Sequence, residues 1–193
     1  PVEFINYSID NIEDLYYPFL AAEECKIAMG IRYENTLVSA IKDKPMDLIK
    51  KQFQPKILGG IENIVNNVKN IKIKIVFNQD IIDTLLNSRE YMILTSMLET
   101  INFEFKQLHT QVTEENFSNF NLVDDELIQP SFDPANKLMG AYISRNKNIY
   151  QVFEDKFKEL FNKSIPINEF IENSDNVKKQ ALSDIQRFVL CLL

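Results

Sequence analysis

The only histidine of the chain, His109, lies in a polar stretch that leads to three consecutive acids. A histidine can act as a nucleophile or as a general acid and base, and Asp124, Asp125 and Glu126 could supply carboxylates for proton transfer. Adjacent acids at the end of a strand are, however, more often a solvated turn. We therefore expect His109 to be a partly exposed polar residue, with Asp124 and Asp125 at the tip of a turn.

Complete catalytic and cofactor motifs are missing from the sequence. The paired glycines, Gly59 and Gly60, lie in a helical pattern rather than in a phosphate-binding loop. There is no GxSxG elbow, no HExxH and no CxxC pair. Cys25 and Cys191 lie in apolar surroundings, which favours buried free thiols in a reducing compartment. We expect neither a metal site nor a cofactor.

Polar residues also follow three of the predicted strands, at 32–34, 78–80 and 144–146. Ligands of open α/β sheets bind beyond the carboxyl ends of parallel strands. The guanidinium groups of Arg32 and Arg145 match a carboxylate or phosphate, although the alternative, that each pairs with a nearby surface acid, is favoured for either residue taken singly. The candidate ligand-binding residues are Arg32, Tyr33, Glu34, Asn78, Asp80, His109, Asp124, Ser144 and Arg145.

Charge and hydropathy set expectations about partners. The net charge is −7 and no run of lysine or arginine stands out. Because an acidic chain is repelled by phosphate backbones, we expect no direct nucleic-acid binding and, as partner, a small anionic ligand. No signal peptide opens the chain, and no apolar run reaches the roughly 18 residues of a membrane span. We expect a soluble, cytoplasmic protein.

The hydrophobic pattern predicts strands alternating with helices, followed by hairpins. The runs 25–31 and 71–77 are apolar and joined by a long helical crossover, so we expect adjacent, buried, parallel strands. Further strands are predicted at 2–9, 101–108 and 137–146, with two more around a turn in 120–132; the polar stretch "HTQVTEEN" is expected to lie outside a buried strand, and 148–162 is the clearest helix. The pattern indicates an α/β fold, with a mixed sheet sandwiched by helices over residues 1–166 and a C-terminal helical arm over 167–193.

Four segments resemble the phospholipase-D-like domains that archaeal transcription regulators, such as the TrmB-like family, use as effector domains. They are "LAAEECKIAMGI", "IKIKIVF", "FNLVDDELIQPSF" and "LMGAYISRNKNIYQVFEDKFKELFNKSIPI". The catalytic pattern of the phospholipase D family, H-x-K-x4-D, would read His109, Gln111 and Asn116 here. Two amides in place of the lysine and the acid remove the charges that stabilise a phosphoryl transition state. The resemblance thus implies a non-catalytic domain.

We expect, on this basis, a ligand-sensing or regulatory domain that acts in transcription or signal transduction and is not an enzyme. Two alternatives stay open: an enzyme that uses strand-end carboxylates such as Glu34 and Asp124, and an oligomerisation or assembly module. The last helix carries an apolar stripe over 177–192, which predicts a homodimer through this arm.

Overall fold

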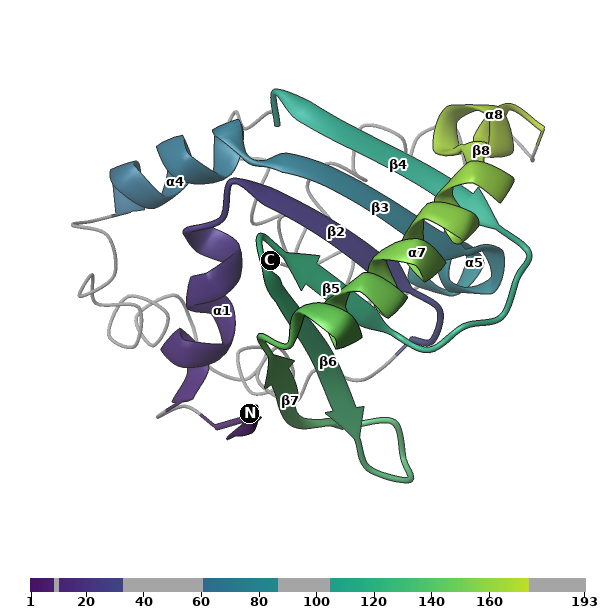
Figure 1. Ribbon diagram of the computed structural model, residues 1–193. Helices are drawn as coiled ribbons and strands as arrows, with labels where there is room; N and C mark the ends of the chain where they lie inside the picture. The colour runs from purple at the N-terminus through teal and green to yellow at the C-terminus, as the bar shows by residue number, and fades with distance from the viewer. Residues whose placement is uncertain (9–10, 33–60, 87–104, 174–193) are drawn as a thin grey trace, which may run out of the picture.

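The two apolar runs of the first half become the centre of an eight-stranded sheet. The computed structural model describes residues 1–8, 11–32, 61–86 and 105–173. Within them β2 (Glu24–Met29) pairs in parallel with β3 (Lys72–Asn78), and Ile27 lies opposite Ile75. Both strands are largely buried, because helices cover parts of both faces of the sheet (Figure 1). The predicted parallel pair is confirmed.

The sheet is mixed. From edge to edge the strand order is β1-β7-β6-β5-β2-β3-β4-β8. Only β2, β3 and β4 run in parallel; the strands on either side of this group are antiparallel to their neighbours. The remaining strands are β1 (Val2–Asn6), β4 (Gln107–Thr113), β5 (Phe120–Val123), β6 (Glu126–Phe132), β7 (Leu138–Ser144) and β8 (Ile165–Pro166).

Helices lie on both faces, which gives the predicted α/β fold with a mixed sheet between helices. The larger core packs α1 (Ile12–Leu20), α4 (Ile61–Asn70), α5 (Gln79–Leu86) and α8 (Ile167–Glu172) against one face. On the opposite face one of the described helices, α7 (Lys147–Lys163), buries Phe157 and Leu160 against Val76 and Leu122. Side chains alternate between the faces along each strand, so Ile75 belongs to the first core and Val76 to the second.

The hairpin reading of 120–132 is confirmed, with Asp124 and Asp125 in the turn between β5 and β6. Asp124 has φ 49, a left-handed conformation that Asp and Asn tolerate better than most residues. Of the strand predicted at 101–108, residues 107 and 108 belong to a strand, residues 105 and 106 do not, and the strand, β4, continues to Thr113. The polar stretch "HTQVT" therefore lies inside the sheet after all. It can be polar there because one face of β4 is only partly covered, as described below.

Several expectations fall on residues outside the described part of the chain. They include Tyr33, Glu34, the first part of the strand predicted at 101–108, Cys191 and the stripe over 177–192. Ile167, the first residue assigned to the C-terminal arm, is 6% exposed and belongs to the larger core. Among the described helices, none is both long and apolar enough to cross a membrane.

Candidate functional site

The carboxyl ends of the parallel strands, where the sequence predicts a ligand, are closed by hydrogen bonds within the protein. Asn119 is 6% exposed and lies in the segment that leads into β5. Its Oδ1 accepts from the backbone N–H groups of Gly30 and Ile31, each at 2.7 Å, and its Nδ2 donates to the Ile31 carbonyl at 2.7 Å. All three bonds are made to the backbone that follows β2. This amide therefore holds the backbone in place rather than presenting a group to a ligand.

Asn78 has the same role at the end of β3. The side chain is 2% exposed. Its Nδ2 donates to the Glu115 carbonyl at 2.8 Å, and its Oδ1 accepts from the Asp80 N–H at 2.9 Å, in the first turn of α5. Thr113 Oγ1 accepts from the Glu115 N–H at 3.2 Å. The polar residues of this edge thus satisfy buried main-chain groups of the turns that follow β3 and β4.

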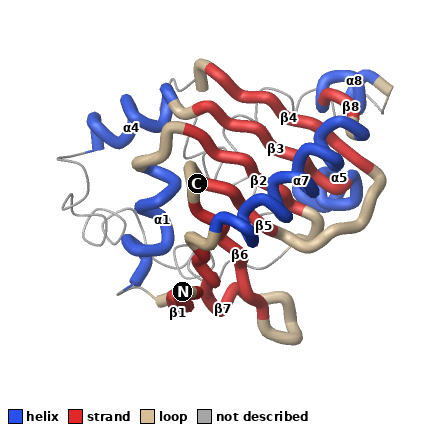
Figure 2. The backbone as a smooth tube through the Cα atoms, viewed as in Figure 1, coloured by secondary structure: helices blue, strands red, loops and turns tan. Residues whose placement is uncertain are grey.

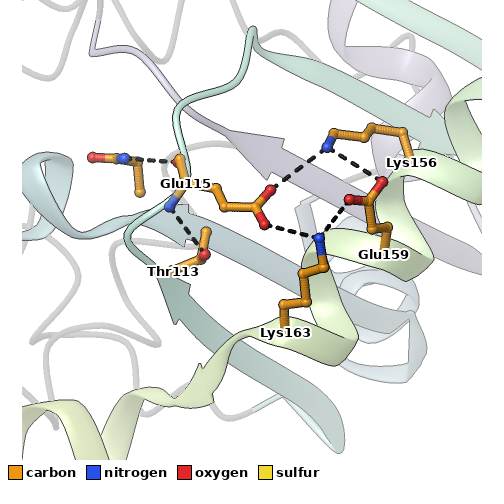
Figure 3. Close-up of polar contacts among 6 residues, drawn as sticks. Thr113, Glu115, Lys156, Glu159 and Lys163 are labelled. Atoms are coloured by element: carbon orange, nitrogen blue, oxygen red, sulfur yellow. Dashed lines mark hydrogen bonds and ion pairs between the residues drawn. The ribbon is translucent and has the colours of Figure 1, made fainter.

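Ion pairs tie α7 to the same edge. Glu115, after β4, faces Lys156, Glu159 and Lys163 of α7 (Figure 3). Glu115 lies 3.6 Å from Lys156 and 3.2 Å from Lys163, and Glu159 lies 3.4 Å and 2.7 Å from the same two lysines. The hydrogen bond from Lys163 lowers the pKa of Glu159 and raises that of Lys163. The two lysines and the two glutamates pair with one another, so this cluster has no uncompensated charge.

The predicted site residues do not converge. Arg32, Asn78 and Asp80 lie at the carboxyl edge of the parallel strands, but Asp124, Ser144 and Arg145 lie at the opposite edge. The reason is strand direction: β5 and β7 run antiparallel to β2, so their carboxyl ends meet the start of β2. Arg32 and Arg145 therefore lie at opposite edges of the sheet and do not share one site.

At that opposite edge, the candidates have structural partners. Asp124 Oδ1 accepts from the backbone N–H groups of Glu23 and Glu24, at 3.0 and 2.9 Å. The Arg145 guanidinium donates to the carboxylate of Glu126. Ser144 is 4% exposed and its hydroxyl accepts from the Asn146 N–H at 3.3 Å. Arg145 thus pairs with a surface acid, the alternative that the sequence left open.

An uncovered part of the sheet lies between these two edges. Figure 2 shows α7 crossing the sheet obliquely, over the carboxyl-terminal halves of β3 and β4, with no described helix over their amino-terminal halves on that side. The side chains on this uncovered surface, called the open face below, are those of Glu24, Lys26, Lys72, Lys74, Gln107 and His109.

The strand register places the basic residues of the open face in a row. Lys26 lies beside Lys74, and Lys74 beside His109, on the neighbouring strands β2, β3 and β4. Lys72 lies two residues before Lys74, which is about 6.6 Å along a strand. Lys72, Lys74 and His109 are exposed. Within the described ranges no carboxylate lies at ion-pair distance from Lys72 or Lys74, whereas the α7 lysines of the edge cluster are all paired.

Lys26 is the one cation of the row that is already neutralised. It donates to Glu154 of α7 at 2.9 Å and lies 3.5 Å from Glu24. Burial acts to lower the pKa of Lys26, but the hydrogen bond to Glu154 and the neighbouring negative charges together outweigh it, and the pKa is raised overall. Glu154 also holds Lys158 at 3.3 Å. Around the open face, four lysines therefore face two glutamates, in a chain whose net charge is −7.

An aromatic ring borders this surface. The ammonium of Lys74 lies 5.8 Å from the ring centroid of Phe161, within the range of a cation–π contact. Phe161 in turn stacks on the buried Phe157 at 5.6 Å. The ring therefore supports the Lys74 side chain without neutralising its charge.

Sequence reasoning named His109 but missed Lys72 and Lys74. The signal was present in "IKIKI", because alternation with buried isoleucines puts both lysines on the opposite face of one strand. Gln111 stands where the phospholipase D pattern has its lysine. Its side chain accepts a hydrogen bond from the Ser164 hydroxyl at 3.3 Å. Among the residues that the structure describes, no three of the His, Cys, Asp and Glu type gather as a metal site would require.

Comparisons with known proteins find similarity at the level of structure. No protein-family model and no curated protein sequence matches the chain. The phospholipase D family member Nuc from Salmonella typhimurium is 13% identical, with a TM-score of 0.46 over 86% of this chain and 97% of that one. NucT from Helicobacter pylori is 11% identical, with a TM-score of 0.48 over 86% and 98%.

A third similar structure is that of TrmBL2, described as an archaeal chromatin protein with a novel mode of DNA binding. It is 16% identical, with a TM-score of 0.44 over 85% of this chain, which spans about half (53%) of TrmBL2. These likenesses describe the arrangement of strands and helices and assign no activity. The expectation of no direct nucleic-acid binding is nevertheless contradicted, since TrmBL2 is described as binding DNA. The net charge on which the expectation rested also does not describe the open face, where Lys72 and Lys74 are exposed.

Proposed function

We propose that this chain is a non-catalytic regulatory domain that binds the phosphate backbone of a nucleic acid on the open face. One observation carries the proposal. Lys72 and Lys74 are exposed and without a described carboxylate partner, and Lys74 lies beside His109, while the lysines of α7 are matched by glutamates. Uncompensated lysines are the groups that exchange counterions for phosphates.

The shape of the surface favours an extended polyanion. The cations follow β3 and cross to β4 along a strand surface, and α7 forms one wall beside them. Such a row can contact successive phosphates along one strand of a nucleic acid. Because the contacts are lysine side chains rather than groups with a fixed hydrogen-bonding fork, we expect binding with little sequence preference.

The non-catalytic part of the proposal rests on the three positions that match the phospholipase D pattern. His109 is exposed on β4, Gln111 is bonded to Ser164, and Asn116 supplies an amide where the family has an acid. The Asn116 side chain approaches Asn78 at 3.5 Å. Gln111 and Asn116 thus lie against neighbouring polar groups of the fold, and neither carries a charge for phosphoryl transfer.

A phosphodiesterase is the second candidate, and one contact favours it. The register puts Lys74 beside His109, so a cation lies next to the histidine although the motif's own lysine is missing. A chromogenic phosphodiester assay distinguishes the two. The proposal predicts no hydrolysis above background; turnover that is lost in His109→Ala would establish the enzyme instead.

Binding is tested by fluorescence anisotropy with labelled single-stranded and duplex oligonucleotides at low salt. The double variant Lys72→Glu, Lys74→Glu should lose at least about tenfold in affinity, because two phosphate contacts become repulsive. Lys137→Glu, Lys147→Glu is the matched control, since both lysines are exposed away from the open face and the net charge changes equally. Equal losses in both double variants would reject the open face as the binding surface.

A further inference from the structure

A pocket of about 550 Å³ lies on the other face of the sheet, at the end that carries β1. It lies between α1 and the strands β1, β6 and β7. Ligand pockets commonly have volumes of about 300 to 1,000 Å³. The pocket lies away from the open face, because Ile5 of β1 and Ile143 of β7, which line it, pack in the larger core on the other side of the sheet.

Two carboxylates line this pocket from different elements. Glu3 comes from β1, where it pairs in register with Ile143, and Asp14 comes from α1. Within the described residues neither carboxylate has a hydrogen-bond or ion-pair partner. The third acid of the lining, Glu126, is neutralised by Arg145. The pocket therefore has two uncompensated negative charges on separate elements.

The helix adds a further acceptor. Pro18 lies inside α1 and also lines the pocket. A proline has no N–H, so the helical hydrogen bond to the carbonyl of Asp14, four residues earlier, cannot form. Tyr17, 48% exposed, contributes an aromatic ring, and Ile5 and Ile143 contribute apolar surface. The lining thus offers negative and neutral oxygen acceptors together with an aromatic and an apolar surface.

We propose that this pocket binds an organic cation that carries primary ammonium groups on an aliphatic chain. An ammonium has three N–H donors and no acceptor, which complements the Glu3 and Asp14 carboxylates and the Asp14 carbonyl. The face of Tyr17 attracts a cation, and the aliphatic chain packs on Ile5 and Ile143. An anion is disfavoured, because the one cation of the lining, Arg145, is occupied by Glu126.

The test is isothermal titration of the whole chain with 1,4-diaminobutane, and with 1,4-butanediol as a neutral compound of the same length. We expect the diamine to bind with a Kd on the order of 1 mM or below and the diol not to bind. Glu3→Gln and Asp14→Asn should each weaken the diamine by about tenfold. Glu172→Gln, an exposed acid on α8, is the control for net charge and should leave the affinity unchanged.

A variant that should bind the diamine more tightly gives the sharper test. Arg145→Gln removes the competing cation and frees Glu126, so diamine binding should tighten by several-fold. Thermal melts of each variant establish that it is folded. No heat of binding up to about 10 mM diamine would overturn the proposal. It would also be overturned if Glu172→Gln weakened binding as much as Glu3→Gln, because that result indicates general charge attraction.

Discussion

The carboxyl edge of the parallel strands and the open face are both rich in polar residues, yet they differ in what those residues contact. At the edge, Asn78 and Asn119 are buried and bonded to main-chain groups, and the charges of Glu115 and Lys163 are paired. On the open face, Lys72 and Lys74 are exposed and lack a described acidic partner. The first region holds the fold together, and the second has charge left to bind something else.

The comparison teaches that a polar residue after a strand is weak support for a ligand site. The turns that follow β2 and β3 leave buried N–H and C=O groups, and each must find a partner. Asparagine supplies both a donor and an acceptor, so it is used there for structure. Uncompensated charge on an exposed surface is the stronger signal, because nothing in the described structure requires it.

The largest effect is expected on stability, when a buried amide at the carboxyl edge of the parallel strands is removed. Asn119→Ala removes three hydrogen bonds and leaves the N–H groups of Gly30 and Ile31 without an acceptor. We expect the free energy of unfolding to fall by about 3 kcal/mol, measured by urea denaturation. Asn121→Ala, on β5, is the control and should cost less than about 1 kcal/mol. Similar losses in the two variants would remove the structural role assigned to Asn119.

A smaller effect should follow a charge introduced at His109, whose neighbour in register is Lys74. His109→Glu puts a carboxylate beside Lys74, so we expect oligonucleotide affinity to fall about fivefold. His109→Gln adds no charge and is the control, which should change the affinity by less than about twofold. Equal affinities of His109→Glu and the unaltered chain would separate His109 from the binding surface.

The sequence predicted much of the fold and little of the site. Alternation in "IKIKIVF" and the apolar run before Gly30 were enough to predict two neighbouring parallel strands, since only buried strands need such runs. The extent of β4 was missed because a strand with one uncovered face need not be hydrophobic on that face.

The location of the candidate site could not be predicted, for two physical reasons. The direction of β7 depends on pairings across the whole sheet, so nothing local places Ser144 and Arg145 at the edge opposite Arg32. Partners distant in sequence decide which charges are neutralised. Lys26 is neutralised by Glu154, 128 residues later, whereas Lys74 lies near the ring of Phe161 and has no carboxylate partner among the described residues.

The smallest effect is expected from the Lys26–Glu154 ion pair at the border of the open face. The hydrogen bond from Lys26 lowers the pKa of Glu154 below its ordinary value of 4.5. A lowered pKa means that the stabilisation is present above that ordinary value and is lost as the pH falls through the lowered one. Glu154→Gln should therefore cost at most about 1 kcal/mol at pH 6 and nothing near pH 2. A cost that persists in acid would show that the pairing is not its source.

The most direct test of the central claim is the salt dependence of oligonucleotide binding. Two cations, Lys72 and Lys74, are available to phosphates on the open face. Each neutralised phosphate of duplex DNA contributes about −0.9 to the slope of log K against log salt, so we predict a slope of about −2, falling to near zero in Lys72→Glu, Lys74→Glu. A slope near zero in the unaltered chain, or one that the double variant leaves unchanged, would contradict phosphate binding on the open face.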